Sequence, residues 1–410
     1  MAKVIEILKQ RVDTTEEINS WLLTTIQSII KQSTNHLKGV ARVMPEFDLH
    51  DSSHSVAVLE VIEMLLGDTA DNLSSLELFY IIASSYLHDC GMAISDFEKN
   101  IMELTEGTDD IYICEDSLKN DGKRCFTYEE AKHFIIQNKN KIYLDFNGEI
   151  QNWLFIPSTE DELVQYLSNL LIEYQSFRNK NYVTIKKSTD FLVTNQLLRT
   201  EYIRLSHHKR IFEYIKNWGK TRFSTFPIIG IGQRIANDLA AICKAHGENP
   251  EYLNKLGTQI EYYGHDSINL QFIAMLLRIG DIVHFNSKRA PLELRALRQF
   301  SSNFSFEQWR IKENGINYNI SNGIIAFRAY ITRPADYYVL QQYIDWIDNE
   351  LHLFLQLSAK WNCKHRLSIR EKVDRSNIAY DDSIFRPVLG LKFTLNQKRI
   401  LDLLMGVGLY

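Results

Sequence analysis

The chain has 410 residues, more than the roughly 250–300 at which a single hydrophobic core stops growing, so we expect one large domain with additions or two domains. Hydrophobic residues make up 45% and charged residues 24%, and only 7 Pro and 18 Gly occur, which excludes collagen-like and low-complexity chains. The net charge of −5 argues against a dedicated nucleic-acid coat or a polybasic membrane binder and leaves room only for a local basic groove.

The five cysteines are scattered and form no C-x-x-C pair, which favours reduced thiols over a disulfide framework or a zinc ribbon. The first twenty residues are amphipathic and charged and lack the apolar core of a signal peptide. No run approaches 18 apolar residues, so no segment is predicted to span a bilayer. We therefore expect a cytoplasmic protein with no membrane partner.

Helical periodicity dominates the first 300 residues. Apolar residues recur at spacings of three and four in six segments, which we predict to be helices: 14–40, 54–66, 75–88, 201–218, 232–246 and 267–281. The third of these helices begins with a predicted capping box, formed by Ser74 and Glu77.

Residues 93–199 are more polar and irregular, and we interpret them as an insertion or a helical lid. After residue 300 the pattern changes to two short strands, 316–320 and 324–331, which Ser321-Asn322-Gly323 would join as a hairpin turn. We expect a helix over 335–361, then a polar linker and an amphipathic stretch at 394–405. The predicted fold class is therefore mainly α, with a helical insertion and a small α+β C-terminal region.

A set of His and Asp residues lies on the apolar stripes of separate helices, in most cases where a helix begins or ends. The set consists of His54, His88, Asp89, His207, His246 and Asp281. Burying such a group without a partner costs a few kcal/mol, so several of them should converge on each other or on a metal. One His on an apolar face is more often a satisfied core residue, so only the whole set indicates a metal site. Imidazole with carboxylate suits Mn, Fe, Zn or Mg, whereas a structural zinc site would have thiolates.

The set resembles the signature of the HD superfamily of metal-dependent phosphohydrolases. The matching segments are Asp51-Ser-Ser-His54-Ser55, Tyr86-Leu87-His88-Asp89-Cys90-Gly91-Met92 and Leu276-Leu277-Arg278-Ile279-Gly280-Asp281. The stretches around His207, His246 and 281–291 are similar to the HD domains of effector and conflict systems. The chain departs from the usual pattern at Cys90 and at His284-Phe285, and the second departure leaves the substrate pocket open.

The resemblance implies an HD-type helical bundle that holds one or two divalent ions. The first ion would be held by His54, His88, Asp89 and Asp281, with Asp89 able to bridge to a second ion. His207 and His246, with or without His208, would hold that second ion or a substrate phosphate. Asp89, His207 and Arg210 are the predicted catalytic residues, and the predicted phosphate contacts are Arg210, Arg278, Lys288 and Arg289.

The resemblance also divides the chain. Residues 1–92 and 200–300 would form the metal-binding core, with 93–199 as the insertion and 301–375 as the small α+β region. Residues 376–410 would be a linker and the start of a second domain, because Phe385-Arg386-Pro387 and the segment 401–410 resemble the first part of a chaperone-type GHKL ATPase. The chain as given ends before the nucleotide-binding helix of such a domain, so we expect no ATP hydrolysis of the GHKL kind from it.

The leading prediction is a divalent-metal phosphohydrolase acting on a nucleotide or related phosphoester, as a module of an ATPase-linked antiviral defence or stress protein. One alternative is a non-catalytic module that senses a nucleotide or a metal and regulates the linked ATPase. Another is an HD-type di-iron oxygenase, which uses a similar set of ligands. We expect no nucleic-acid partner, and a homo-oligomer remains open.

Overall fold

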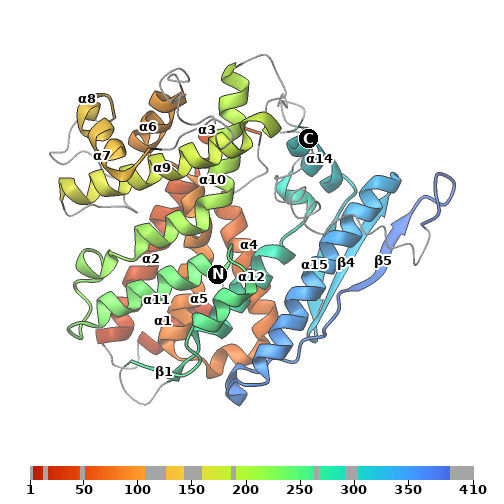
Figure 1. The fold of residues 1–410 in the computed structure, drawn as a ribbon. Coiled ribbons are helices and arrows are strands. Elements are labelled where there is room, and N and C mark those ends of the chain that lie inside the picture. Colours follow the sequence, from red (N-terminus) through yellow and green to blue (C-terminus); the bar gives the residue numbers. More distant parts are fainter. Residues whose placement is uncertain are drawn as a thin grey trace. The chain divides into compact units, whose positions relative to one another are not determined.

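The computed structural model describes residues 3–12, 17–46, 51–106, 126–142, 159–185, 191–262, 267–290, 295 and 303–387. They are mainly helical, with small sheets toward the C-terminus, which confirms the predicted fold class (Figure 1). The chain forms two compact units, one of Met1–Gly91 with His208–Thr394 and the other of Met92–His207 with Leu395–Tyr410.

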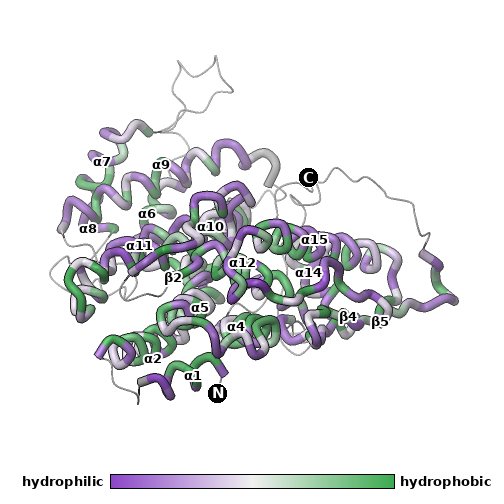
Figure 2. The backbone as a smooth tube through the Cα atoms, turned by 90° about the horizontal axis from the view of Figure 1, so that it is seen from below, coloured by the Kyte–Doolittle hydropathy of each residue, from purple (hydrophilic) through white to green (hydrophobic). Residues whose placement is uncertain are grey.

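The first unit is built on two helices that are buried almost all round, α5 (Ser75–Leu87) and α12 (Leu270–Val283). Both appear as hydrophobic segments in Figure 2, as expected for helices inside a core. Ser74 and Glu77 form the predicted capping box at the start of α5, and the Asn269 side chain accepts a hydrogen bond from the backbone N–H of Phe272 at the start of α12.

The other helices of the first unit surround this pair. They are α1 (Lys3–Val12), α2 (Glu17–Leu37), α3 (Val40–Val43), α4 (Ser52–Leu66), α11 (Ile231–Ala245), α14 (Asn303–Lys312) and α15 (Pro334–Ser358). Helix α10 (Phe191–Ile215) belongs to this unit from His208 onward. The six helices predicted for the first 300 residues are all present, with bounds that differ by a few residues except in α10, which begins ten residues earlier.

The second unit is also helical. It contains α6 (Asp96–Glu106), α7 (Tyr128–Gln137), α8 (Lys139–Ile142), α9 (Glu160–Ile185) and the first part of α10. Two tyrosines of α9 donate hydrogen bonds to carboxylates of α6: Tyr166 to Glu98 and Tyr174 to Glu106, each at 2.5 Å. These bonds satisfy carboxylates that the packing buries.

A three-stranded sheet follows α14. The antiparallel strands β3 (Asn317–Ser321) and β4 (Ile324–Ile331) form the predicted hairpin, with Ser321 opposite Ile324. Asn322 and Gly323 have φ angles of 51° and 70°, the left-handed conformations that a two-residue turn of this kind requires. A short antiparallel pair, β1 (Ile260–Glu261) and β2 (Ser267–Ile268), lies elsewhere in this unit.

The prediction of a polar linker after the long helix was wrong over part of its length. Residues Asp374–Tyr380 form β5, which pairs in parallel with β4 and completes the sheet order β3-β4-β5. This edge strand has few apolar residues, and its pairing depends on a partner more than 40 residues earlier in the chain. The predicted stretch at 394–405 lies outside the described residues.

In the part of the chain that the structure describes, no helix has the length and hydrophobicity needed to cross a membrane.

Candidate metal centre

The two histidines of the centre come from the ends of two core helices. His54 lies in the first turn of α4, which Asp51 caps by accepting a hydrogen bond from the Ser53 backbone N–H. His88 closes α5, and its ring Nδ1 donates to the carbonyl oxygen of Ser85 at 3.0 Å. The two Nε2 atoms lie 3.3 Å apart, and both side chains are buried.

Two carboxylates complete the cluster. Asp89 Oδ2 lies 3.2 Å from His54 Nε2 and 3.4 Å from His88 Nε2, and Asp281 Oδ1 lies 3.1 and 3.9 Å from the same two nitrogens. The Asp89 side chain is 5% exposed, whereas that of Asp281 is 31% exposed. Asp281 is therefore the most solvent-exposed of the four side chains.

The spacing of these four atoms fits a divalent ion. Metal bonds of about 2.0–2.2 Å to nitrogen and oxygen place neighbouring ligand atoms about 3.0–3.5 Å apart in tetrahedral or octahedral geometry. Four of the five separations above fall in that range. His54, His88 and Asp89 are a group whose ligand atoms all lie within 4.8 Å of one another. The neighbouring Cys90 thiol is buried, which raises its pKa well above the usual value and disfavours a thiolate ligand.

The electrostatics of the cluster favour positive charge at its centre. Burial alone would lower the pKa of His88, but the charge and hydrogen bond of Asp89 raise it to about 9. Burial alone would raise the pKa of Asp89, but the His88 charge and the hydrogen bonds from His54 and His88 hold it well below its usual range. The pKa of Asp281 is also lowered, because the hydrogen bond from His54 and the charge of His88 outweigh burial. A cation site needs this property.

His284 is a member of the centre that the sequence analysis did not place there. Its Nδ1 lies 2.7 Å from Nδ1 of His54, and the two rings stack with centroids 5.0 Å apart. A partner at Nδ1 fixes the orientation of a ligating imidazole and the nitrogen that carries its hydrogen. His284 comes three residues after Asp281, and residues at this spacing lie on the same face of a helix. This spacing is the feature of the sequence that could have placed His284 near the cluster.

A model of one protein family, described as HD-CE, matches residues 44–353. The chain belongs to the HD-CE family. The match contains His54, His88, Asp89 and Asp281, so the prediction of an HD domain is confirmed, while a linked GHKL ATPase remains a prediction. Comparison with curated proteins and with solved structures found no match.

His246 lies beside the four-residue cluster of this HD-CE protein. It caps α11, and its ring lies edge-on to that of His88, with centroids 5.1 Å apart. One of its ligand atoms lies within 4.8 Å of one of Asp89. His208 stands next to it at 6.4 Å between ring centroids, and its Nε2 lies 3.7 Å from Glu248 Oε1. This proximity permits a second ion, but its presence stays a prediction.

His207 belongs to the other unit, and its Nδ1 donates to the Arg204 carbonyl oxygen at 2.5 Å within α10. Its role as a ligand stays a prediction.

Arg210, in the first unit, donates to the carbonyl oxygen of Gly91 and, at 2.6 Å, to the hydroxyl of Tyr214. The contact with Gly91 supports the short turn that presents Asp89.

The three other basic residues differ in their surroundings. Lys288 is exposed in the short 3₁₀ helix Ser287–Arg289, and Arg289 is buried, with Nη1 3.5 Å from the His284 carbonyl oxygen. Arg278 bonds to Glu350 and to two backbone carbonyls, so the structure favours a structural role for it over the predicted phosphate contact. Phosphate binding by each of the three stays a prediction.

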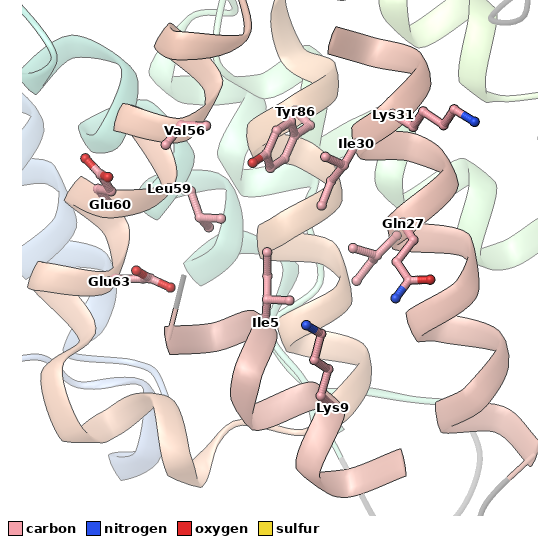
Figure 3. A pocket seen from close by; sticks show the side chains of 11 residues that line it. Ile5, Lys9, Gln27, Ile30, Lys31, Val56, Leu59, Glu60, Glu63 and Tyr86 are labelled. Atoms are coloured by element: carbon pink, nitrogen blue, oxygen red, sulfur yellow. The ribbon is translucent and has the colours of Figure 1, made fainter. Parts of the chain in front are cut away.

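A pocket of about 600 Å³ lies elsewhere in the first unit, between α1, α2, α4 and α5 (Figure 3). Ile26, Ile30 and Leu59 are among its apolar lining residues, and lysine and glutamate side chains lie around them. None of the predicted site residues lines this pocket, although Tyr86 comes two residues before His88. The candidate metal centre and this pocket are therefore separate features.

Proposed function

We propose that this HD-CE protein is a divalent-metal-dependent phosphohydrolase that acts on a nucleotide or a related phosphoester. The convergence of two carboxylates on the His54 and His88 pair carries the proposal: the two Nε2 atoms lie 3.3 Å apart, and Asp89 Oδ2 and Asp281 Oδ1 each lie 3.1–3.9 Å from both of them. These four residues would hold a divalent ion, which would supply a bound water that ionises near neutral pH and would offset negative charge on phosphate oxygens.

The protein's own residues would position the substrate. Asp281 is the most exposed member of the cluster, so we place the phosphoester on its side. Lys288 and Arg289 follow on the same segment, and their charges would attract and orient a phosphate there. We place His246 against the scissile phosphate or a second ion, because its ring lies beside His88.

Arg210 would act on the geometry of the site. Its guanidinium holds the Gly91 carbonyl and stacks on Tyr214, with its central carbon 5.6 Å from the ring centroid. Because Gly91 is two residues from Asp89, this contact would keep the carboxylate aimed at His54 and His88. We assign His207 to a second ion or the substrate phosphate on the strength of the sequence alone.

Phosphate release by the purified chain tests the proposal. The protein is stripped with a chelator, reloaded with Mn²⁺, Fe²⁺, Mg²⁺ or Zn²⁺, and incubated with a panel of nucleotides and phosphoesters, with Asp89→Asn as the control. Metal-dependent release that the control lacks supports the proposal. Metal binding without release would favour the sensor, and iron-dependent oxygen uptake would favour the oxygenase.

We further propose that the whole protein couples this centre to a GHKL ATPase. The support is the sequence resemblance at Phe385-Arg386-Pro387 and in 401–410, the second of which lies outside the described residues. Metal-dependent phosphate release that responds to ATP in the natural full-length protein would support this coupling, and indifference to ATP would contradict it.

A further inference from the structure

A buried ion pair joins α12 to α15 one helical turn before Asp281. Arg278 donates from Nε and Nη2 to the two carboxylate oxygens of Glu350, at 2.9 and 2.5 Å, and the side chains are 8% and 7% exposed. Figure 1 shows the two helices next to each other, in agreement with their packing. A bidentate pair fixes orientation as well as distance, and separating it would leave two buried charges unpaired.

The same guanidinium holds the turn that carries His246. Arg278 Nη1 donates to the carbonyl oxygens of Ala245 and Glu248, both at 2.7 Å. These carbonyls lie on either side of His246 and Gly247 at the end of α11, where a helix leaves such groups without intrahelical partners. Arg278 therefore sets the position of the turn whose imidazole lies against His88.

A second contact from α15 falls on the other side of Asp281. The Tyr343 hydroxyl donates to the carbonyl oxygen of Ile282 at 2.5 Å, and the Tyr343 ring stacks on Phe285 with centroids 4.0 Å apart. Ile282 directly follows Asp281, and its carbonyl is among the last four of α12. Helix α15 thus holds α12 both before and after the exposed metal ligand.

We propose that α15 is the positioning element of the metal centre, acting through Glu350 and Tyr343 on Asp281 and, by way of Arg278, on the His246 turn. The inference rests on the proposed metal centre. Because α15 begins three residues after β4 and packs on it, a partner that moves the β3-β4-β5 sheet would change metal affinity without touching a ligand.

Titration of the metal-free chain with Co²⁺ tests this inference, because the visible spectrum of Co²⁺ reports the number and geometry of its ligands. The variants are Glu350→Gln, which keeps the shape but removes the charge, and Tyr343→Phe, which removes one hydrogen bond. Asp336→Asn is the matched control: Asp336 is also a buried acid of α15, and it accepts from Arg310 and Asn314 at 2.9 and 3.0 Å.

Loss of a group that is hydrogen-bonded to a metal ligand typically lowers metal affinity about 10–100-fold. Glu350 acts one residue further out, through Arg278, so we expect a loss of about 10-fold for Glu350→Gln. Tyr343→Phe should give a smaller loss, and both spectra should change. Asp336→Asn should lower the melting temperature yet keep the wild-type affinity and spectrum, because its bonds lead away from Asp281.

The inference would be overturned if Glu350→Gln and Tyr343→Phe both kept the wild-type Co²⁺ affinity and spectrum. It would also be overturned if Asp336→Asn lost as much Co²⁺ affinity as they do, or if the wild type bound no Co²⁺. If Glu350→Gln does not fold, Tyr343→Phe alone decides. If the wild type binds Co²⁺ through Asp89 but hydrolyses no phosphoester, the proposed function fails and the positioning role of α15 stands.

Discussion

His54 and His88 face each other through their Nε2 atoms at 3.3 Å, while the Nδ1 atom of each ring is engaged elsewhere. For His88 the partner is a carbonyl oxygen, so Nδ1 carries the hydrogen and Nε2 presents a lone pair in the neutral ring. If the His54 hydrogen also lies on Nδ1, toward His284, both Nε2 atoms present lone pairs to the same point. The pair of carboxylates at the same point makes a divalent cation the natural occupant.

Replacing Asp89 by Asn should abolish metal retention and activity while leaving the helical circular-dichroism signal largely intact. The substitution removes a ligand charge, so the loss should exceed the roughly 10–100-fold effect of losing an outer partner. Metal content is measured by mass spectrometry after gel filtration. Asp71→Asn, on the surface, is the control, and full metal content in Asp89→Asn would show that the ligand assignment is wrong.

Replacing His284 by Phe should lower metal affinity by about 10–100-fold. The ring could still stack on His54, but Nδ1 of His54 would lose its partner and the imidazole its fixed orientation. Calorimetric titration with Mn²⁺ measures the effect. An unchanged affinity would mean that packing alone orients His54.

Loss of His246 or His207 should reduce phosphate release far more than loss of His352. His352 is an exposed residue paired with Glu371, so its replacement by Ala is a suitable control. His36, which also matches no part of the HD signature, is a poorer control because its Nε2 bonds to the Cys90 carbonyl oxygen at 3.0 Å. Equal rates in His246→Ala and His352→Ala would remove His246 from the site.

Glu77 should make the stability of the first unit depend on pH. Its buried carboxylate accepts hydrogen bonds from His365 Nε2 at 2.6 Å and from the backbone N–H groups of Ser74 and Asn269, at the starts of α5 and α12. Burial alone would raise its pKa, but the bonds from His365 and Ser74 lower it below the usual 4.5. Stability from a lowered carboxyl pKa is present above the unfolded-state value and is lost as the pH falls through the folded-state value.

Glu77→Gln should therefore cost about 1.5–3 kcal/mol of unfolding free energy at pH 7. The difference in unfolding free energy between wild type and variant should shrink below about pH 4. There Glu77 becomes protonated in the unfolded chain at a higher pH than in the folded chain, and the stability from its charge is lost. Urea unfolding at pH 7 and pH 3.5 measures both quantities. If wild type and Glu77→Gln differed in unfolding free energy by the same amount at pH 7 and at pH 3.5, this role of the Glu77 charge would be contradicted.

The features that could be predicted from the sequence are those with local causes. The capping box at Ser74 and the turn at Asn322-Gly323 are set by neighbouring residues. Apolar residues at spacings of three and four predicted the helices. Because His54, His88 and Asp281 lie on those stripes, their convergence could also be predicted.

Contacts between distant segments could not be predicted in the same way. Glu350 pairs with a residue 72 positions away, and nothing near it in the sequence distinguishes it from a surface acid of an amphipathic helix. Strand β5 is defined by its pairing with β4 across the whole of α15. The bond of His284 to His54 likewise spans 230 positions, although its spacing from Asp281 was a usable signal.

Anomalous diffraction from crystals of the Mn²⁺-loaded protein tests the central claim most directly. We predict a peak at the manganese edge within bonding distance of His54 Nε2, His88 Nε2, Asp89 and Asp281, and its absence from crystals of Asp89→Asn. A peak at any other set of residues, or none at this cluster in the loaded wild type, would contradict the account.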